Sequence, residues 1–140
     1  MTAGHVAETY LRVILELEED RIPPLRARLA ERTANSLPLV CQNITRLERR
    51  GLVRLAPDRR LILTRPGRRL AVAALRKHRL AELLLVEIIG LPPDQATREA
   101  PRWVHVLTDR AERHIHTLLG HPSHSTTGRP IPGLTHLDPR

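Results

Sequence analysis

The stretch from Ser36 to Gly51 constrains the fold more than any other part of the chain. Val40, Ile44 and Leu47 recur at helical spacing, so they place an apolar stripe along one side of a helix. Ser36 suits the N-cap of this helix, and Gly51 suits a left-handed C-terminal cap. The other side carries amide and guanidinium groups, which a helix needs in order to read the major groove of DNA. A solvated surface helix gives the same pattern, so the neighbouring residues have to decide between the two.

The residues on either side of this helix predict a winged helix-turn-helix. A short helix over Leu25–Arg32 precedes it, and the connection Thr33–Asn35 is short enough for a helix-turn-helix, whose second helix enters the groove. Two β-prone runs, Leu52–Leu55 and Leu61–Thr64, then flank a turn and predict a hairpin. A hairpin directly after a recognition helix is a wing, and its tip would bring Arg59 and Arg60 to DNA phosphates. The neighbouring turn and wing therefore favour the groove-reading helix.

The remainder of the chain predicts further helices. Pro66–Ile89 forms a long helix that is apolar on nearly all its sides, which predicts a subunit interface in so small a chain. Leu91–Ala100 is a shorter helix that Pro101 should interrupt. A last helix should begin at a capping box at Asp109 and face Ile115, Leu118 and Leu119 inward. An irregular tail rich in Pro, Gly, Ser, Thr and His should follow it. We therefore expect a mainly α chain, with a winged helix-turn-helix DNA-binding domain at residues 1–73 and a helical dimerisation domain at residues 74–140.

The composition fits this arrangement and favours a nucleic-acid partner. Aromatic residues are only 1% of the 140 residues and Phe is absent, so the core must be aliphatic, which suits helices packed on helices. The formal net charge is +8, and residues 1–73 hold 14 arginines against 8 acids. An arginine-rich coding bias can raise the total charge, but the excess lies in the half that contains the groove-facing helix. Such asymmetry indicates double-stranded DNA as the partner.

Several classes of protein are disfavoured by what the sequence lacks. The lone cysteine, Cys41, allows no internal disulfide, and no apolar run is long enough to span a membrane. The first residues do not resemble a signal peptide, so we expect a cytoplasmic protein. The sequence has no glycine-rich phosphate loop, no HExxH motif and no nucleophile with a base at a recognisable spacing, so we expect no enzyme.

Short segments along the chain also carry a family resemblance. They are Tyr10–Glu19, Pro24–Arg32, Arg46–Val53, Arg76–Glu82, Ile88–Leu91, Glu99–Val106 and Gly128–Gly133. Through them the chain resembles the diphtheria toxin repressor family of iron-dependent regulators over essentially its whole length. The resemblance implies a homodimer that binds a palindromic operator, most often as a repressor. Many members carry a third, SH3-like domain that would follow residue 140, so the chain is expected to be a two-domain form or a shortened one.

The resemblance also assigns DNA contacts. It carries the family's recognition positions onto Ser36, Pro38 and Gln42; Gln can pair with adenine, and Pro38 can touch a thymine methyl. Leu39 stands where the family has a hydroxyl residue, so the operator is expected to differ from the usual one. Phosphate contacts, which fix register rather than sequence, are expected from Arg26, Arg28, Arg46, Arg49 and Arg59.

The resemblance implies a divalent-metal switch, whose ligand positions are only partly kept. At the ancillary site His78 and Glu82 match the family, and Thr97 replaces a His. At the primary site only His105 is kept. The other primary positions, which hold Met, Cys and Glu in the family, are here Thr9, Pro101 and Val104.

Because a transition-metal site needs three or four ligands, we expect the primary site to be lost. His78 and Glu82 would then share a hydrogen bond, and the response to metal would be lost or altered. One alternative is a rebuilt site in which His78, Glu82 and another His hold Fe²⁺, Mn²⁺, Co²⁺ or Zn²⁺. Another is a chain deficient in DNA binding that pairs with an intact relative.

Overall fold

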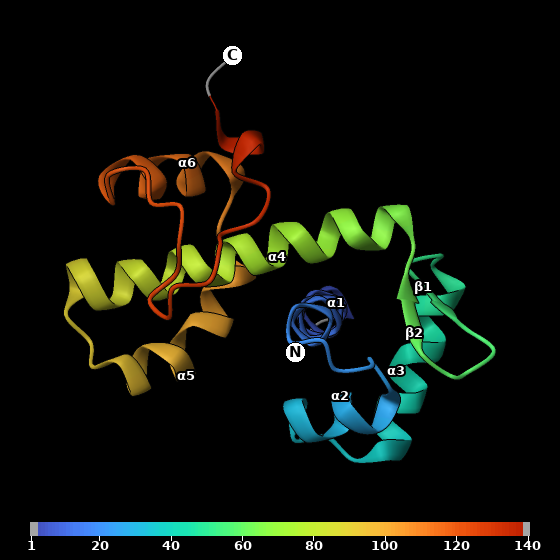
Figure 1. Cartoon of the computed structure of the whole chain (residues 1–140). Helices are drawn as coiled ribbons and strands as arrows, with labels where there is room; N and C mark the ends of the chain where they lie inside the picture. The colour runs from blue at the N-terminus through green and yellow to red at the C-terminus, as the bar shows by residue number, and fades with distance from the viewer. Residues whose placement is uncertain (1–2, 139–140) are drawn as a thin grey trace. The chain divides into compact units, whose positions relative to one another are not determined.

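The computed structural model describes residues 3–138 and is mainly helical (Figure 1). The chain forms two compact units, residues 1–72 and 73–140. No helix among the described residues is both long and apolar enough to cross a bilayer. The predicted fold class, a winged helix-turn-helix followed by a helical region, is confirmed.

Three helices build the core of the first unit. They are α1 (Ala3–Glu19), α2 (Arg26–Thr33) and α3 (Leu37–Arg49). The chain turns sharply between α2 and α3 because Ala34 adopts a left-handed conformation, with φ of 55°. Tyr10 is buried in α1, and its hydroxyl accepts hydrogen bonds from the side-chain amides of Asn35 (2.8 Å) and Asn43 (3.1 Å). The turn and α3 are therefore both fastened to α1 by polar contacts as well as by the apolar core.

Helix α3 has the ends and the buried stripe that the sequence predicts. The hydroxyl of Ser36 accepts a hydrogen bond from the amide of Leu39 at 3.3 Å, and Pro38 lies in the first turn. Its buried side holds the predicted Val40, Ile44 and Leu47. Asn43, which was expected to point away from this stripe, is buried with them because its side chain donates to the hydroxyl of Tyr10. After the helix, Gly51 has a φ of +72°, which favours a residue without a Cβ.

The wing is a two-stranded antiparallel hairpin. Strand β1 (Val53–Leu55) pairs with β2 (Leu61–Leu63) so that Val53 lies opposite Leu63. The amide of Leu61 also donates to the carbonyl of Pro24 at 2.8 Å, which ties the wing to the segment before α2. The wing is therefore held by a backbone hydrogen bond to the segment that leads into the helix-turn-helix.

The second unit is built around the C-terminal part of α4 (Arg65–Leu84), a helix that continues into a π-helical turn, η1 (Leu85–Ile89). Helices α5 (Pro93–Val104) and α6 (Asp109–Leu118) follow, and a short 3₁₀ helix, η2 (Leu134–Leu137), closes the described chain. One apolar cluster joins α4 to the C-terminal segment, and its buried members are Leu80, Leu83, Ile131 and Leu137. Another joins α4 and η1 to α5, and its buried members are Ala81, Leu85, Ala96 and Ala100.

Three local predictions for this unit are wrong. Helix α5 continues through Pro101 to Val104, because Ala96, Ala100 and Val104 are buried and their packing outweighs the backbone hydrogen bond that proline cannot donate. The N-cap of α6 is Thr108, whose hydroxyl accepts from Ala111 at 3.2 Å. Leu118 is 60% exposed rather than buried, whereas its neighbour Leu119 packs on the core.

Candidate DNA-binding surface and metal-type site

The exposed side of α3 forms the candidate DNA-binding surface. Gln42, Arg46 and Arg49 are exposed on it, directly opposite the buried stripe. The hydroxyl of Ser36 accepts the cap hydrogen bond from Leu39, so its own hydrogen can still donate to a phosphate oxygen. This side therefore presents hydrogen-bonding groups and cations together, the chemistry that base edges and phosphates require.

The arginines that the sequence assigns to phosphates come from α2, α3 and the wing. Arg26 is half-buried on α2, while Arg28 is exposed and pairs with Glu31 at 2.8 Å. Within residues 3–138, no ion pair engages Arg46, Arg49 or Arg59. Three cations of this surface are thus available to an anionic partner.

The tip of the wing is fixed by local polar contacts. Arg59 has a φ of 71°, and its amide donates to the carbonyl of Ala56 at 2.8 Å. Arg60 pairs with Asp58 at 2.7 Å. The pKa of Asp58 is lowered, first because its carboxylate accepts a hydrogen bond from the backbone amide of Arg60. Of the two arginines at the tip, Arg60 is therefore engaged within the turn and Arg59 is presented outward by it.

His78 and Glu82 form a close pair on α4. The Nε2 atom of His78 lies 2.6 Å from Oε1 of Glu82, and both side chains are largely buried. Glu82 also accepts a hydrogen bond from the hydroxyl of Thr126 at 3.3 Å. The Nδ1 atom of His78 is buried and has no hydrogen-bond partner among the described residues. The pair offers two metal-ligating side chains to a cation. In the structure these two side chains contact each other instead.

The other family positions do not complete a metal site. The hydroxyl of Thr97 donates to the carbonyl of Pro93, and that of Thr9 donates to the carbonyl of His5, both at 3.0 Å within their own helices. Pro101 and Val104 have no donor atom in their side chains, and His105 is a half-buried residue at the C-cap of α5. No group of three or more His, Cys, Asp or Glu side chains among residues 3–138 could hold a metal ion. The donor set does not fit a transition metal bound in the family's manner.

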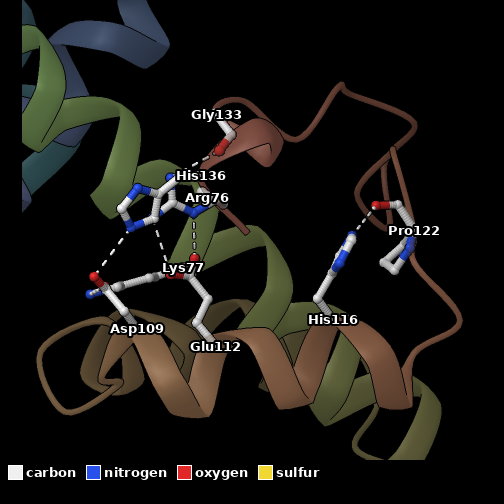
Figure 2. Close-up of polar contacts among 8 residues, drawn as sticks. All are labelled: Arg76, Lys77, Asp109, Glu112, His116, Pro122, Gly133 and His136. Atoms are coloured by element: carbon white, nitrogen blue, oxygen red, sulfur yellow. Dashed lines mark hydrogen bonds and ion pairs between the residues drawn. The ribbon is translucent and has the colours of Figure 1, made fainter. Parts of the chain in front are cut away.

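Several polar contacts in the second unit were not predicted from the sequence. Figure 2 shows Arg76 and Glu112 paired inside the unit, with Arg76 also donating to the carbonyl of Gly133. It also shows Asp109 between His136 and Lys77. These partners lie far apart in the sequence, so no local pattern could have identified them. The only local signal is the place of Glu112 three positions after the expected helix start, and that signal predicts a cap rather than a buried ion pair.

Two protein-family models match nearly the whole chain. The iron dependent repressor N-terminal DNA binding domain matches residues 3–61, and the iron dependent repressor metal binding and dimerisation domain matches residues 64–133. The first covers the winged helix-turn-helix, and the second begins just before α4.

Curated relatives and solved structures agree with these matches. The iron-dependent repressor IdeR of Mycobacterium tuberculosis is 53% identical over 130 residues, which are 93% of this chain and 56% of the relative. The diphtheria toxin repressor of Corynebacterium diphtheriae is also 53% identical over 130 residues, 93% of this chain and 58% of the relative. A manganese-dependent transcriptional repressor solved in complex with manganese has a TM-score of 0.85 at 35% identity, covering 92% of this chain and 59% of that one. The manganese regulator SloR has a TM-score of 0.84 at 29% identity, covering 95% and 61%. The chain thus spans a little over half the length of the curated relatives it matches.

Proposed function

Since the chain belongs to the iron-dependent repressor family, we propose that it is a sequence-specific DNA-binding transcription regulator whose binding does not depend on metal. In this proposal it represses transcription as a homodimer on a palindromic operator. The observation that carries the proposal is the exposed polar and cationic side of α3, held beside a wing. This is the arrangement in which a helix-turn-helix reads the major groove.

The residues of the DNA surface then have distinct roles. Ser36, Pro38, Leu39 and Gln42 face the bases, because the N-terminal residues of a recognition helix contact base edges. The remaining positions contact phosphates and fix the register of the protein; they are Arg26, Arg28, Arg46, Arg49 and Arg59.

The homodimer is proposed to form through residues 74–140, with residues 1–73 as the DNA-binding domain. The two compact units support this division, and apolar side chains that remain exposed at the end of the α4–η1 helix support an interface there. Ile88 is 52% and Ile89 51% exposed. Two large apolar neighbours exposed on one turn favour a protein interface, and a second copy of the chain matches the twofold symmetry of a palindrome.

Loss of the metal switch is supported by the donor set. A bound Fe²⁺ or Mn²⁺ would need three or four ligands at one site. The ancillary positions supply only His78 and Glu82 and the primary positions only His105, and among the described residues no three such side chains come together. The other family positions hold side chains that cannot ligate or that bond to their own helix. We therefore assign His78 and Glu82 a hydrogen bond that holds α4 to the C-terminal segment through Thr126.

The test is to select a binding site from random duplexes and then to measure affinity with a chelator and with added Fe²⁺, Mn²⁺, Co²⁺ or Zn²⁺. We expect the same affinity in every condition. The matched control is IdeR, which is named as an iron-dependent repressor. A gain in affinity with any of these metals, at the scale seen for that control, would overturn the metal-independent proposal.

One observation favours a second candidate, metal control through a rebuilt site. Nε2 of His78 and Oε1 of Glu82 converge to 2.6 Å, so a cation that replaced their hydrogen bond could be held by both together with a further histidine. In that case isothermal titration calorimetry should show stoichiometric metal binding that His78→Ala removes. Absence of binding to the unmodified chain would exclude this candidate.

A further inference from the structure

Two large apolar side chains are exposed at the start of α3. Leu37 is 49% and Leu39 is 42% exposed, whereas Ile44 and Leu47 of the same helix are buried. Neither leucine belongs to the apolar stripe of the helix, so core packing does not explain them. The family resemblance assigned no role to Leu37.

The helix geometry places the two leucines on opposite flanks of the groove-facing side. They are two positions apart, which corresponds to a rotation of roughly 200° around the helix axis. Pro38 and Gln42 lie within that arc, between the two leucines. Because Cα–Cβ bonds tilt toward the N-terminus of a helix, both side chains also lean toward the end that approaches base edges in a helix-turn-helix.

The surroundings favour DNA as the group that covers these leucines. Arg46 and Arg49 are exposed on the same helix, and within residues 3–138 no ion pair engages them. Charge complementarity therefore points to a polyanion. Among the bases in the major groove, thymine alone offers a methyl group, and leucine has no hydrogen-bonding group with which to read anything else there.

We propose that Leu37 and Leu39 are specificity-determining residues that select thymines, through their C5-methyl groups, on both sides of the base pair that faces Gln42. This inference rests on the proposed function, because it requires α3 to lie in the major groove. It adds a chemical statement about the operator. Each half-site holds one thymine on each side of the base pair that faces Gln42. Each thymine lies on the strand that presents its methyl group to Leu37 or Leu39.

The first experiment removes single methyl groups from the DNA. After a binding site has been selected from random duplexes, each thymine is replaced in turn by deoxyuridine, which keeps the base pairing and deletes only the methyl. We expect two replacements in each half-site to weaken binding by about fourfold, the factor that burial of one methyl-sized group provides. Apart from a thymine touched by Pro38, the other replacements should leave the affinity unchanged.

The second experiment assigns each methyl group to its leucine. Leu39→Ser should remove the sensitivity to deoxyuridine at one of the two thymines and leave the other, and Leu37→Ser should do the reverse. Leu118→Ser, at an exposed leucine of α6, is the matched control and should keep both sensitivities. Because both α3 leucines are exposed, the variants should keep the thermal unfolding midpoint of the unmodified protein.

The outcomes separate this inference from the function on which it rests. Binding that is indifferent to every deoxyuridine replacement overturns the inference and leaves the DNA-binding function standing. Retention of both sensitivities in both serine variants overturns it as well. If no duplex is bound at all, the proposed function falls and the inference falls with it. The deoxyuridine scan uses the unmodified chain, so it decides the matter even where a variant does not fold.

Discussion

Glu112 is a fully buried carboxylate, and Arg76 is its counter-ion. Nε and Nη2 of Arg76 donate to the two carboxylate oxygens at 2.5 and 3.1 Å, and Nη1 donates to the carbonyl of Gly133 at 3.2 Å (Figure 2). The pair joins α4, α6 and the C-terminal segment. Removal of one partner leaves the other charged group buried without compensation, which costs far more than an intact pair contributes.

The first prediction follows from this asymmetry. Glu112→Ala should lower the free energy of unfolding by about 3–5 kcal/mol, measured by urea denaturation. Arg98→Ala, which breaks an exposed pair with Asp94, should change it by less than about 1 kcal/mol. The double variant Arg76→Met, Glu112→Met should recover most of the loss, because neither charge is then left buried. Similar losses in the single and double variants would contradict this account.

Asp109 gives a prediction about pH. Its pKa is lowered, first by the hydrogen bond from His136 and further by the charge of Lys77. A carboxyl group whose pKa is lower in the folded than in the unfolded protein stabilises the fold at pH values above its unfolded pKa. This stabilisation is lost as the pH falls through the pKa of the folded protein. Asp109→Asn should therefore reduce stability at ~pH 6, and its cost should shrink as the pH falls below the ordinary pKa of Asp toward ~pH 3.

The size of this effect is limited by solvent. Asp109 and His136 are each about half exposed, so the difference between the two pH values should stay under about 1 kcal/mol. Asp138→Asn, at an exposed carboxylate two residues after His136, is the control for the general loss of charge. If both variants show the same pH dependence, the contact with His136 does not stabilise the fold.

At the scale of elements, the start of α4 lies directly against the backbone before the wing. A Cβ added at Gly67 would lie 1.9 Å from the carbonyl oxygen of Leu52, a group that cannot move away as a flexible side chain could. Gly67→Ala should therefore destabilise the first unit by about 1–3 kcal/mol, although alanine is the better helix former. A thermal melt monitored by circular dichroism measures the change.

Gly51→Ala is the matched comparison for Gly67→Ala. Gly51 has a φ of +72° and nothing within 4 Å of an added Cβ, so its cost is conformational, about 1–2 kcal/mol. Combining Gly67→Ala with Leu52→Ala should not relieve the first defect, since the clash is with backbone. A Gly67→Ala variant that is as stable as the unmodified chain would show that the wing and α4 can separate without cost.

The elements that the sequence predicts well are those whose signals are local. The buried stripe of α3, its Ser36 cap and the hairpin after it all follow from spacing and turn chemistry within a few residues. The predictions at Pro101 and Glu112 were wrong or incomplete because tertiary contacts decide their conformations: packing carries α5 through the proline, and Arg76, 36 positions away in the sequence, holds Glu112. The same holds for Asn43, a polar residue within the apolar stripe, whose partner Tyr10 lies on another helix.

The candidate site divides in the same manner. Exposure of Gln42, Arg46 and Arg49 follows from helical periodicity, and so the composition of the candidate DNA-binding surface could be predicted. The pairing of Arg60 with Asp58, which leaves Arg59 as the arginine presented at the tip, depends on the turn conformation. The hydrogen bonds of Thr9 and Thr97 to their own helices likewise depend on side-chain rotation, which no sequence pattern fixes.

At the scale of the whole molecule, the uneven charge becomes a measurable property of DNA binding. Residues 1–73 hold 14 arginines against 8 acids, whereas residues 74–140 hold 9 basic residues against 7 acids. If the surface of α3 binds phosphates, affinity must fall steeply with salt, because each neutralised phosphate releases counterions. The slope of log affinity against log salt concentration is proportional to the number of phosphates that are neutralised. It therefore includes the contacts made by every copy of the chain on the operator.

The last prediction uses this count. Arg46→Gln and Arg49→Gln should each weaken binding to all duplexes alike and reduce the slope by about 1.8, since a phosphate contact contributes about 0.9 and a homodimer loses two. Arg113→Gln, at an exposed arginine of α6, removes the same charge from the second unit and should leave the slope unchanged.

A reduction of about 0.9 for Arg46→Gln or Arg49→Gln would mean that one copy engages the DNA, which contradicts the homodimer while keeping the contact. An unchanged slope would remove the arginine from the interface, and a reduction for Arg113→Gln would show that the long-range field of the chain, rather than the surface of α3, governs its attraction to DNA.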